Sequence, residues 1–417
     1  MRSAVAFVLL AAHLVSAVVV APVDYTGTKV FRLPTEKKNV KEVQRIIDEL
    51  HLDTWKYPKK AGANADIVVP AAQVSSFLKR IDGMNRVVMH EDLGKSIAKE
   101  NTFPVVQAGT TNATWFNAYH SYQQHVTWLT DIQRQYPSNS EVVTVGTSHE
   151  GRQINAIHLW GKAKNANPAV IFHGTIHARE WISTMVVEYF IWQFLSGYGG
   201  NADITSILDK YDLWIVPIVN PDGFLYTQSR DRMWRKNRAP NSGSSCVGTD
   251  LNRNYPISWS GGGSSPDPCN ETYRGRSASD TTEIKAHTAW MRQIASGRGV
   301  KLFIDWHSYS QLFLSPYAYS CSARPANDAK HQTLARAFAS ALRAVHGVSY
   351  RTGPLCPTLY QASGSSVDWA FDVLKAEISY TAELRDTGAS GFILPPSQIL
   401  PSGQETLAGL IALMKQL

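Results

Sequence analysis

Residues 22–91 contain helical and strand-like patterns of hydrophobic positions, which together predict a small folded unit. Apolar residues recur every three or four positions over residues 39–50 and 74–81, as on one face of a helix. The order strand, helix, strand, strand, helix, strand is that of a ferredoxin-like α+β unit. Short apolar runs predict its strands over residues 28–33, 52–55, 67–69 and 86–89.

Residues 92–112 show little hydrophobic periodicity, so we expect an exposed linker of the kind that proteases cut. From about residue 113 onward, the pattern predicts an α/β fold, a mixed twisted sheet with helices on both faces. In such sheets, sites form beyond the carboxyl ends of the strands. Strands are expected over residues 142–145, 154–160, 169–174, 213–219, 301–306 and 376–382, and helices over 119–134, 181–195, 281–295, 328–345 and 404–415.

The first twenty residues have the features of a secretory signal peptide. Met1-Arg2 supplies a positive start, and an apolar stretch follows to Val20. Small residues predict a cut after Ala17, with Ala21 as a second candidate. A membrane anchor is the alternative, but the cut site inside the stretch favours secretion. No later segment has the length and hydrophobicity of a membrane span.

Composition narrows the functional classes further. With 44% hydrophobic and 18% charged residues, the chain of 417 residues is expected to bury a large core. A formal net charge of +7 raises the question of nucleic-acid binding. The Lys and Arg residues are scattered rather than clustered, which argues against that function.

Four cysteines in a secreted chain predict two disulfides, and three pairings are open. Pairing of sequence neighbours, Cys246 with Cys269 and Cys321 with Cys356, is the simplest choice. The spacing contains no CxxC pair, which argues against a cysteine zinc site. Asn112 and Asn270 each begin an Asn-X-Thr sequence and are candidate glycosylation sites.

Histidines and carboxylates follow three of the predicted strands. His177 and Glu180 come just after residues 169–174, and His307 ends the strand at 301–306. Two imidazoles and one carboxylate form a typical catalytic zinc site, which keeps a position open for water. Asp305 or a backbone carbonyl is expected to orient one of the rings, and the pattern does not decide between them.

Glu383 follows the strand at 376–382 and is expected at the same edge of the sheet. A carboxylate beside the metal can accept the proton of the attacking water and later deliver it to the leaving amine. The alternative for Glu383 is a salt bridge with Arg385. The predicted zinc site favours the general-base role.

Arg235 and Arg253 lie in loops next to aromatic or turn residues. A guanidinium group can bind a substrate carboxylate through two parallel hydrogen bonds, or stabilise an oxyanion. The alternative for both is ordinary surface charge. Tyr360 lies in a loop rich in Gly and Ser, where a phenol can close over a substrate.

Taken together, seven motifs resemble those of the A/B-type zinc metallocarboxypeptidases of pancreas and fungi, as a complete precursor. They agree with that family in order and spacing, although several are weak singly. The motifs are His177-Ala-Arg-Glu180, Asn220-Pro-Asp-Gly223, Trp234-Arg-Lys236, Asp250-Leu-Asn-Arg253, Asp305-Trp-His307-Ser-Tyr309, Tyr360-Gln-Ala-Ser-Gly364 and Glu383-Leu-Arg-Asp386.

The resemblance implies one zinc ion held by His177, Glu180 and His307, with Glu383 as the general base and Arg235 stabilising the oxyanion. It implies that peptides and proteins with a free C-terminus are the substrates, and that the mature enzyme is a monomer. It also suggests the Cys246–Cys269 disulfide. The residues implied to bind the substrate are Asn252 and Arg253 at its terminal carboxylate, Tyr360 closing on that carboxylate, and Arg179, Ser308 and Tyr309 at neighbouring subsites.

Val367 bears on specificity, because the resemblance places it at the base of the side-chain pocket. B-type members have an aspartate there, which selects Lys and Arg. An apolar floor cannot pair a buried cation, so Val367 predicts an A-type preference for aromatic and aliphatic C-terminal residues. A shift of one residue would instead place Asp368 in the pocket and reverse this prediction.

The chain is therefore expected to be a secreted zinc exopeptidase made as a zymogen. Residues 1–17 are expected to be the signal peptide, 18–112 an inhibitory prosegment with its linker from about 92, and 113–417 the catalytic domain. Another protease is expected to cut the linker. Two alternatives are a zinc deacylase and a peptide-binding relative without activity. The carboxylate-binding set argues against the first, and the complete metal-and-base set argues against the second.

Overall fold

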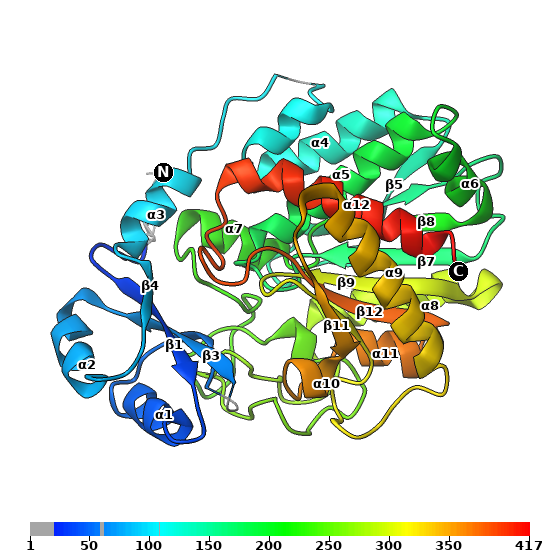
Figure 1. Ribbon diagram of the computed structural model, residues 1–417. Helices are drawn as coiled ribbons and strands as arrows, with labels where there is room; N and C mark the ends of the chain where they lie inside the picture. The colour runs from blue at the N-terminus through cyan, green and yellow to red at the C-terminus, as the bar shows by residue number, and fades with distance from the viewer. Residues whose placement is uncertain (1–20, 59–61, 108) are drawn as a thin grey trace, which may run out of the picture.

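The N-terminal part of the chain forms a four-stranded antiparallel sheet with two helices, drawn in blue in Figure 1. The computed structural model describes residues 21–58, 62–107 and 109–417, so residues 1–20 of the predicted signal peptide lie outside the described residues. The strand order β2-β3-β1-β4 confirms the ferredoxin-like prediction. The elements are β1 (Lys29–Thr35), α1 (Val40–Glu49), β2 (Thr54–Lys56), β3 (Ala63–Val69), α2 (Val74–Arg80) and β4 (Val87–His90).

Residues 93–100 form a helix, α3 (Leu93–Glu100), where the sequence analysis expected a weakly structured linker. The prediction was wrong because it overlooked a short local helical pattern, in which Leu93 and Ile97 lie one turn apart on the packed face. Asp92 caps it by accepting the backbone N–H of Lys95. Leu93 is fully buried, and Glu100 forms a buried ion pair with Arg232 of the larger unit.

The larger unit contains an eight-stranded sheet in the order β11-β10-β12-β9-β7-β8-β6-β5. Its centre, β12-β9-β7-β8, is parallel, and β5 and β6 continue it antiparallel at one edge. This confirms the mixed α/β sheet. The strands are β5 (Ser140–Thr147), β6 (Gln153–Leu159), β7 (Ala169–Gly174), β8 (Asp212–Val216), β9 (Val300–His307), β10 (Leu312–Ser315), β11 (Arg351–Pro354) and β12 (Ile378–Glu383).

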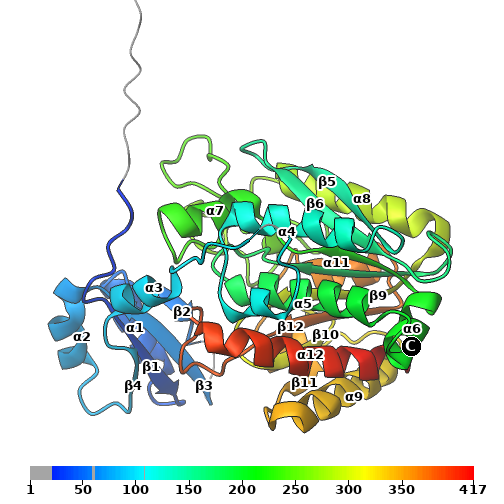
Figure 2. The same cartoon turned by 90° about the horizontal axis from the view of Figure 1, so that it is seen from above.

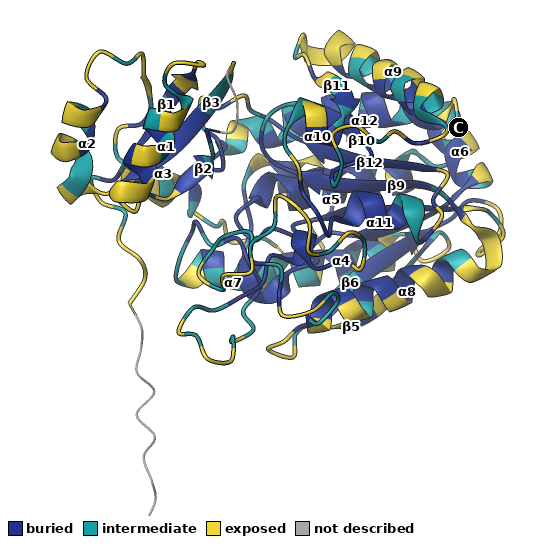
Figure 3. Cartoon of the chain, turned by 90° about the horizontal axis from the view of Figure 1, so that it is seen from below, coloured by how far each residue is buried: buried dark blue, intermediate teal, exposed yellow. Residues whose placement is uncertain are grey.

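Helices cover both faces of this sheet, with α9 and α12 on one side and α8 on the other in Figure 2. Figure 3 shows dark blue strands between helices whose outer surfaces are yellow, so the sheet is the buried layer. The helices are α4 (Tyr122–Gln135), α5 (Trp181–Gly197), α6 (Ala202–Lys210), α7 (Pro221–Ser229), α8 (Thr282–Arg298), α9 (Asp328–His346), α10 (Leu355–Thr358), α11 (Ser366–Asp372) and α12 (Ile399–Met414).

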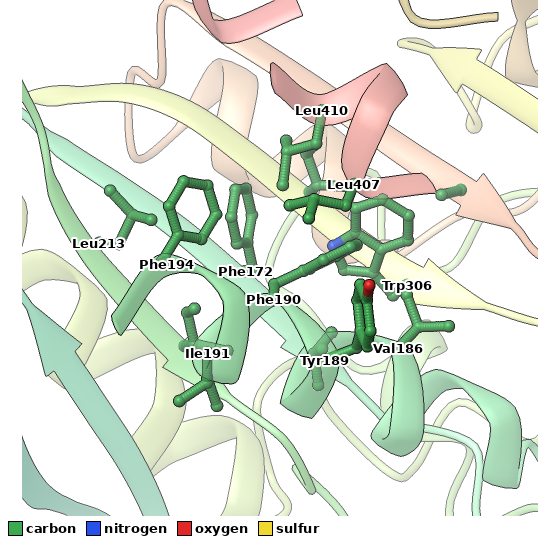
Figure 4. Close-up of a cluster of buried hydrophobic side chains, with 14 of the residues drawn as sticks. Phe172, Val186, Tyr189, Phe190, Ile191, Phe194, Leu213, Trp306, Leu407 and Leu410 are labelled. Atoms are coloured by element: carbon green, nitrogen blue, oxygen red, sulfur yellow. The ribbon is translucent and has the colours of Figure 1, made fainter. Parts of the chain in front are cut away.

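The main core lies between the sheet and helices α5 and α12. Phe172 and Trp306 from neighbouring strands pack with Phe190 of α5 and Leu410 of α12 (Figure 4). Nearly every residue of α5 is buried, so this helix is apolar on all sides rather than amphipathic. The tightly packed layer holds the strand ends that carry the polar residues described below.

The long elements agree with the sequence-based expectations to within a few residues, and both neighbouring disulfides, Cys246–Cys269 and Cys321–Cys356, are present. Helix α12 begins at Ile399, five residues before the expected start at 404. Pro401 falls in its first turn, where a backbone N–H has no helical partner to lose. Within the part of the chain that the structure describes, no helix combines the length and hydrophobicity of a membrane span.

Candidate metal centre and cleft

Three parallel strands, β7, β9 and β12, bring the predicted polar residues to one edge of the sheet. His307 and Glu383 end β9 and β12 and face each other in the strand register. β7 ends at Gly174, and the following turn carries His177 and Glu180 to the same edge. The candidate residues therefore gather beyond the carboxyl ends of the strands, where sites are expected in such sheets.

The turn after β7 begins with backbone strain at Thr175, whose φ of 52° lies in the left-handed region. This conformation is costly for a β-branched residue and persists only where the surroundings enforce it. The backbone N–H of Thr175 donates to Ser183 Oγ at 2.9 Å, and its hydroxyl lies 2.9 Å from the same oxygen. The first turn of α5 thus fixes the path that leads to His177.

His177, Glu180 and His307 form a buried cluster of metal-ligand type. One possible donor atom from each lies within 4.8 Å of the others. The Nδ1 atoms of His177 and His307 lie 2.9 and 3.0 Å from the two carboxylate oxygens of Glu180. The two Nδ1 atoms are themselves 3.0 Å apart. Two imidazole nitrogens and a carboxylate converging on one point fit a zinc ion.

The electrostatics of the cluster favour an ionised Glu180. Burial by itself would raise the pKa of this carboxyl, but the two imidazoles outweigh burial and hold the pKa below its usual value. The far side of each ring also meets a carboxylate. Asp250 Oδ1 lies 3.2 Å from Nε2 of His177, and Asp305 Oδ2 lies 2.7 Å from Nε2 of His307. The group beside the His307 ring is thus Asp305 rather than a backbone carbonyl, a choice that the sequence did not decide.

Glu383 lies buried beside this cluster and lines the cleft in front of it. Burial raises its pKa to about 8, although the neighbouring His307 acts in the opposite direction. The alternative role as a partner of Arg385 is not supported. Arg385 donates instead to the buried Glu405 at 2.8 Å and to Gln398.

Arg235 is buried, so the alternative of a surface charge does not hold for it. Its Nε and Nη2 atoms donate to Asp250 Oδ2 at 3.1 and 2.8 Å, and its Nη1 lies 3.9 Å from Glu180. Arg253 is buried as well and donates to the carbonyl oxygens of Gly263 and Asn252. Both guanidinium groups line the cleft.

Asn252 is buried as well and is held by side-chain hydrogen bonds. Its amide nitrogen donates to Asp305 Oδ2 at 3.0 Å, and its amide oxygen accepts the backbone N–H of Ser366 at 2.8 Å. Tyr360 is half-buried and lines the cleft. The cleft has a volume of about 530 Å³, and residues of both units line it.

Val367 belongs to a buried apolar cluster next to the cleft. Its other members are Leu312, Leu314, Ala318, Leu355 and Ala362, with Leu359 and Tyr360 packed against them. The carboxylate of the neighbouring Asp368 is occupied by the protein itself, because it accepts the backbone N–H groups of Ala318 and Tyr319, each at 2.9 Å. Burial raises the pKa of Asp368 to about 7, although these hydrogen bonds lower it.

The N-terminal unit reaches the cleft through β2 and β3. The phenol of Tyr309 donates to Asp66 Oδ2 at 2.5 Å, and Arg32 donates to both oxygens of that carboxylate at 2.6 Å. The ammonium group of Lys56 lies 4.4 Å above the ring of Tyr309. Burial lowers the pKa of Lys56, while nearby carboxylates raise it. Ser308 also lines the cleft at this position.

Arg179 lies on the same side of the cleft, and its contacts include residues that the sequence analysis missed. Its guanidinium lies 4.5 Å from the ring centre of Phe392 and donates to Glu271 at 3.1 Å. Phe392 and Glu271 both line the cleft. Phe392 stands in the apolar run Phe392-Ile-Leu394, which carries no functional signal. Only the fold brings this ring to the cleft.

Comparison with families of known proteins matches residues 125–409 to the zinc carboxypeptidase family, and residues 32–100 to the carboxypeptidase activation peptide. The chain belongs to the zinc carboxypeptidase family. The protein is 62% identical over 417 residues to metallocarboxypeptidase A of Arthroderma otae, which covers 100% of this chain and 99% of that one. It is 38% identical over 402 residues to carboxypeptidase A4 of Mus musculus, covering 94% of each chain.

Among solved structures, this carboxypeptidase resembles thrombin activatable fibrinolysis inhibitor with a TM-score of 0.87 and 30% identity, covering 94% of this chain and 99% of the other. Carboxypeptidase A from Helicoverpa armigera gives a TM-score of 0.81 and 28% identity over 94% and 97% of the two chains. The family resemblance carried by the seven motifs is therefore confirmed. The protein is an A-type zinc metallocarboxypeptidase with an activation peptide.

Proposed function

We propose that this carboxypeptidase is secreted, holds one zinc ion at His177, Glu180 and His307, and removes aromatic or aliphatic residues from the C-termini of peptides and proteins. One observation carries the proposal. His177 and Glu180 of the buried cluster line a cleft together with Glu383, Arg235 and Arg253, next to an apolar cluster around Val367. The donor set supports zinc because two imidazoles and a carboxylate leave a coordination position open.

In the proposed mechanism, Glu383 moves the proton. A bound zinc ion supplies a Lewis acid that activates water and polarises the scissile carbonyl. Glu383 accepts a proton from the attacking water and passes it to the amine that leaves. Arg235 donates to the carbonyl oxygen as negative charge develops there. Its contacts with Asp250 hold the guanidinium in position, so little reorganisation is needed.

Recognition of the free C-terminus falls to Arg253, Asn252 and Tyr360. A fixed guanidinium binds a terminal carboxylate through two parallel hydrogen bonds. A cation at this position favours an exopeptidase, because a continuing chain would bring a neutral amide to it. Asn252 contributes its amide once it exchanges a protein partner for the substrate, and Tyr360 closes over the bound carboxylate.

The apolar cluster around Val367 supports the A-type preference. A Phe or Leu side chain that packs against it is desolvated favourably, whereas a Lys or Arg side chain would lose its hydration without gaining a counter-ion. Asp368 does not offer that counter-ion, because backbone N–H groups already bind its carboxylate. The one-residue shift that would reverse the preference is therefore disfavoured.

The prosegment is proposed to keep the enzyme latent. Tyr309, Arg179 and Ser308 are the proposed neighbouring subsites, and the Tyr309 hydroxyl is bound by Asp66 of the prosegment. Because residues 93–100 are helical, the proposed cut lies within residues 101–112. The prosegment then comprises residues 18–112 and the catalytic domain residues 113–417, as the sequence predicts.

Secretion is supported by the two disulfides, which persist in oxidising compartments. The signal peptide is proposed to end at residue 17, with 21 as the second candidate. Asn112 is exposed and Asn270 is half-buried, and both are proposed to carry glycan. The mature enzyme is proposed to act as a monomer, without nucleic acid or membrane partners.

The test uses secreted protein activated by a protease, with release of Phe from a blocked dipeptide as the readout. We expect the chelator o-phenanthroline and the substitution Glu383→Gln each to abolish release. Glu377→Gln is the matched control, because Glu377 precedes the same strand and pairs with Lys301 and Lys330 away from the cleft. Full release by Glu383→Gln would refute the proposed base, and release that resists the chelator would refute the metal centre.

A further inference from the structure

Asp305 lies at the centre of a buried polar group that spans three strands behind the metal ligands. His173 of β7 is the register partner of Asp305, and Thr381 of β12 is its partner on the other side. Asp305 and His307 are two residues apart on β9, so their side chains point to the same face of the sheet. The strand pairing therefore places His173, Asp305 and His307 next to one another.

The two oxygens of Asp305 contact different partners. Oδ1 lies 2.7 Å from Nε2 of His173, and Oδ2 lies 2.7 Å from Nε2 of His307. The amide nitrogen of Asn252 lies 3.0 Å from Oδ2 and 3.1 Å from Nε2 of His307, and it donates to Oδ2 when that ring nitrogen carries the proton. The hydroxyl of Ser366 donates to the same carboxylate oxygen. Asp305 and His173 are fully buried. A buried carboxylate is costly unless charged or hydrogen-bonding groups surround it. Here Oδ2 accepts hydrogen bonds, whereas Oδ1 has the His173 ring at ion-pair distance without an aligned hydrogen bond.

The orientation of the His307 ring explains what this carboxylate does. Nδ1 of His307 faces Glu180 and His177, so it is the nitrogen that offers its lone pair to the metal. A neutral imidazole that binds metal through Nδ1 carries its proton on Nε2, and that N–H needs an acceptor. His177 has the same arrangement, with Nδ1 toward Glu180 and Nε2 toward Asp250.

We propose that Asp305 is a positioning residue for the metal centre, which holds His307 in the tautomer and orientation that zinc requires and links this ligand to Asn252. His173 fixes Asp305 in turn, from the neighbouring strand. The inference rests on the proposed zinc site and deepens it. It assigns two carboxylate-oriented histidines to the site, with Asp250 behind one ring and Asp305 behind the other.

The test measures the zinc dissociation constant of the full-chain precursor by competition with a chromogenic chelator. Asp305→Asn keeps the shape of the side chain and removes its charge, so we expect zinc to bind about 10–100-fold more weakly. Asp212→Asn is the matched control. Asp212 is also a fully buried partner of a histidine, 3.7 Å from His158, but at the start of β8, away from the metal-binding edge. Its zinc affinity should stay within twofold of the wild type.

A folded Asp305→Asn protein that binds zinc within twofold of the wild type would overturn the proposal. If that variant fails to fold, Ser366→Ala removes one hydrogen bond to the same carboxylate oxygen and is expected to weaken zinc binding severalfold. Unchanged affinity there would overturn it equally. The visible spectrum of the cobalt(II)-substituted precursor should also shift in these variants, a change that a purely structural residue does not cause. Zinc binding that survives His307→Ala would refute the proposed metal centre itself. This outcome differs from the one that refutes only the role of Asp305.

Discussion

The buried ion pair between Glu100 and Arg232 makes docking of the prosegment testable. Arg232 donates to both oxygens of Glu100, at 2.6 and 3.0 Å, and both side chains are about 2% exposed. Removing one partner of a buried pair costs about 3–5 kcal/mol, because the remaining charge stays desolvated. Arg232 keeps contacts with two carbonyl oxygens and with the ring of Trp181, so we expect the lower figure.

With the cut proposed within residues 101–112, Glu100 belongs to the prosegment and Arg232 to the enzyme. Glu100→Gln should therefore weaken the cut complex by about 3 kcal/mol, which is a dissociation constant about 100-fold higher. The measurement dilutes the cut precursor and follows the appearance of peptidase activity against concentration. Glu91→Gln is the control, because the pair of Glu91 with Lys29 is exposed and contributes about 0–1 kcal/mol. A dissociation constant for Glu100→Gln within threefold of the wild type would show that this reasoning is wrong.

Three further predictions concern the pocket, pH and the metal. Val367→Asp should lower kcat/KM for peptides ending in Phe by about 100-fold and raise it for those ending in Lys, and steady-state rates with both peptides check this. Because burial raises the pKa of Asp368 to about 7, the folded protein binds this proton more tightly than the unfolded chain. The protonated carboxyl stabilises the folded protein below about pH 4, and this contribution is lost as pH rises through 7. Asp368→Asn should therefore reduce the difference between the free energies of unfolding measured in urea at pH 4.5 and 7.5. Removing zinc should lower the free energy of unfolding, and restoring free zinc to a thousandfold above its dissociation constant should raise it by about 4 kcal/mol, measured by the same unfolding.

Helices and strands with a clear local pattern of hydrophobic residues were predictable from the sequence. β7 is a parallel strand buried on both faces, and it reads as an unbroken apolar run from Ala169 to Phe172. Its limits were therefore correct. β10 and β11 were missed because each has four residues, and β11 contains Gly353 and Pro354. Helix α3 was missed because its local pattern is short, with a cap at Asp92 and only two apolar residues, Leu93 and Ile97, at helical spacing.

The metal cluster was predictable because each ligand follows a strand end in the sequence. The residues around the cluster were less predictable, because their roles depend on side-chain contacts that only the folded structure creates. Asp66 and Tyr309 are 243 residues apart, and their contact requires the two units to dock. His173 lies inside an apolar strand and looks like a core residue until the strand register sets it against Asp305.

The pairing of His173 with Asp305 also has a consequence for how this protein evolves. The two positions are neighbours in the register of β7 and β9, and neither side chain reaches solvent. An apolar residue at 305 alone would remove the carboxylate that lies 2.7 Å from the buried His173 ring, and an apolar residue at 173 alone would remove the ring that faces Oδ1 of Asp305. Single changes at either position are therefore deleterious intermediates. Positions 173 and 305 should covary among relatives, so that an alignment of sequences shows the two changing as a pair.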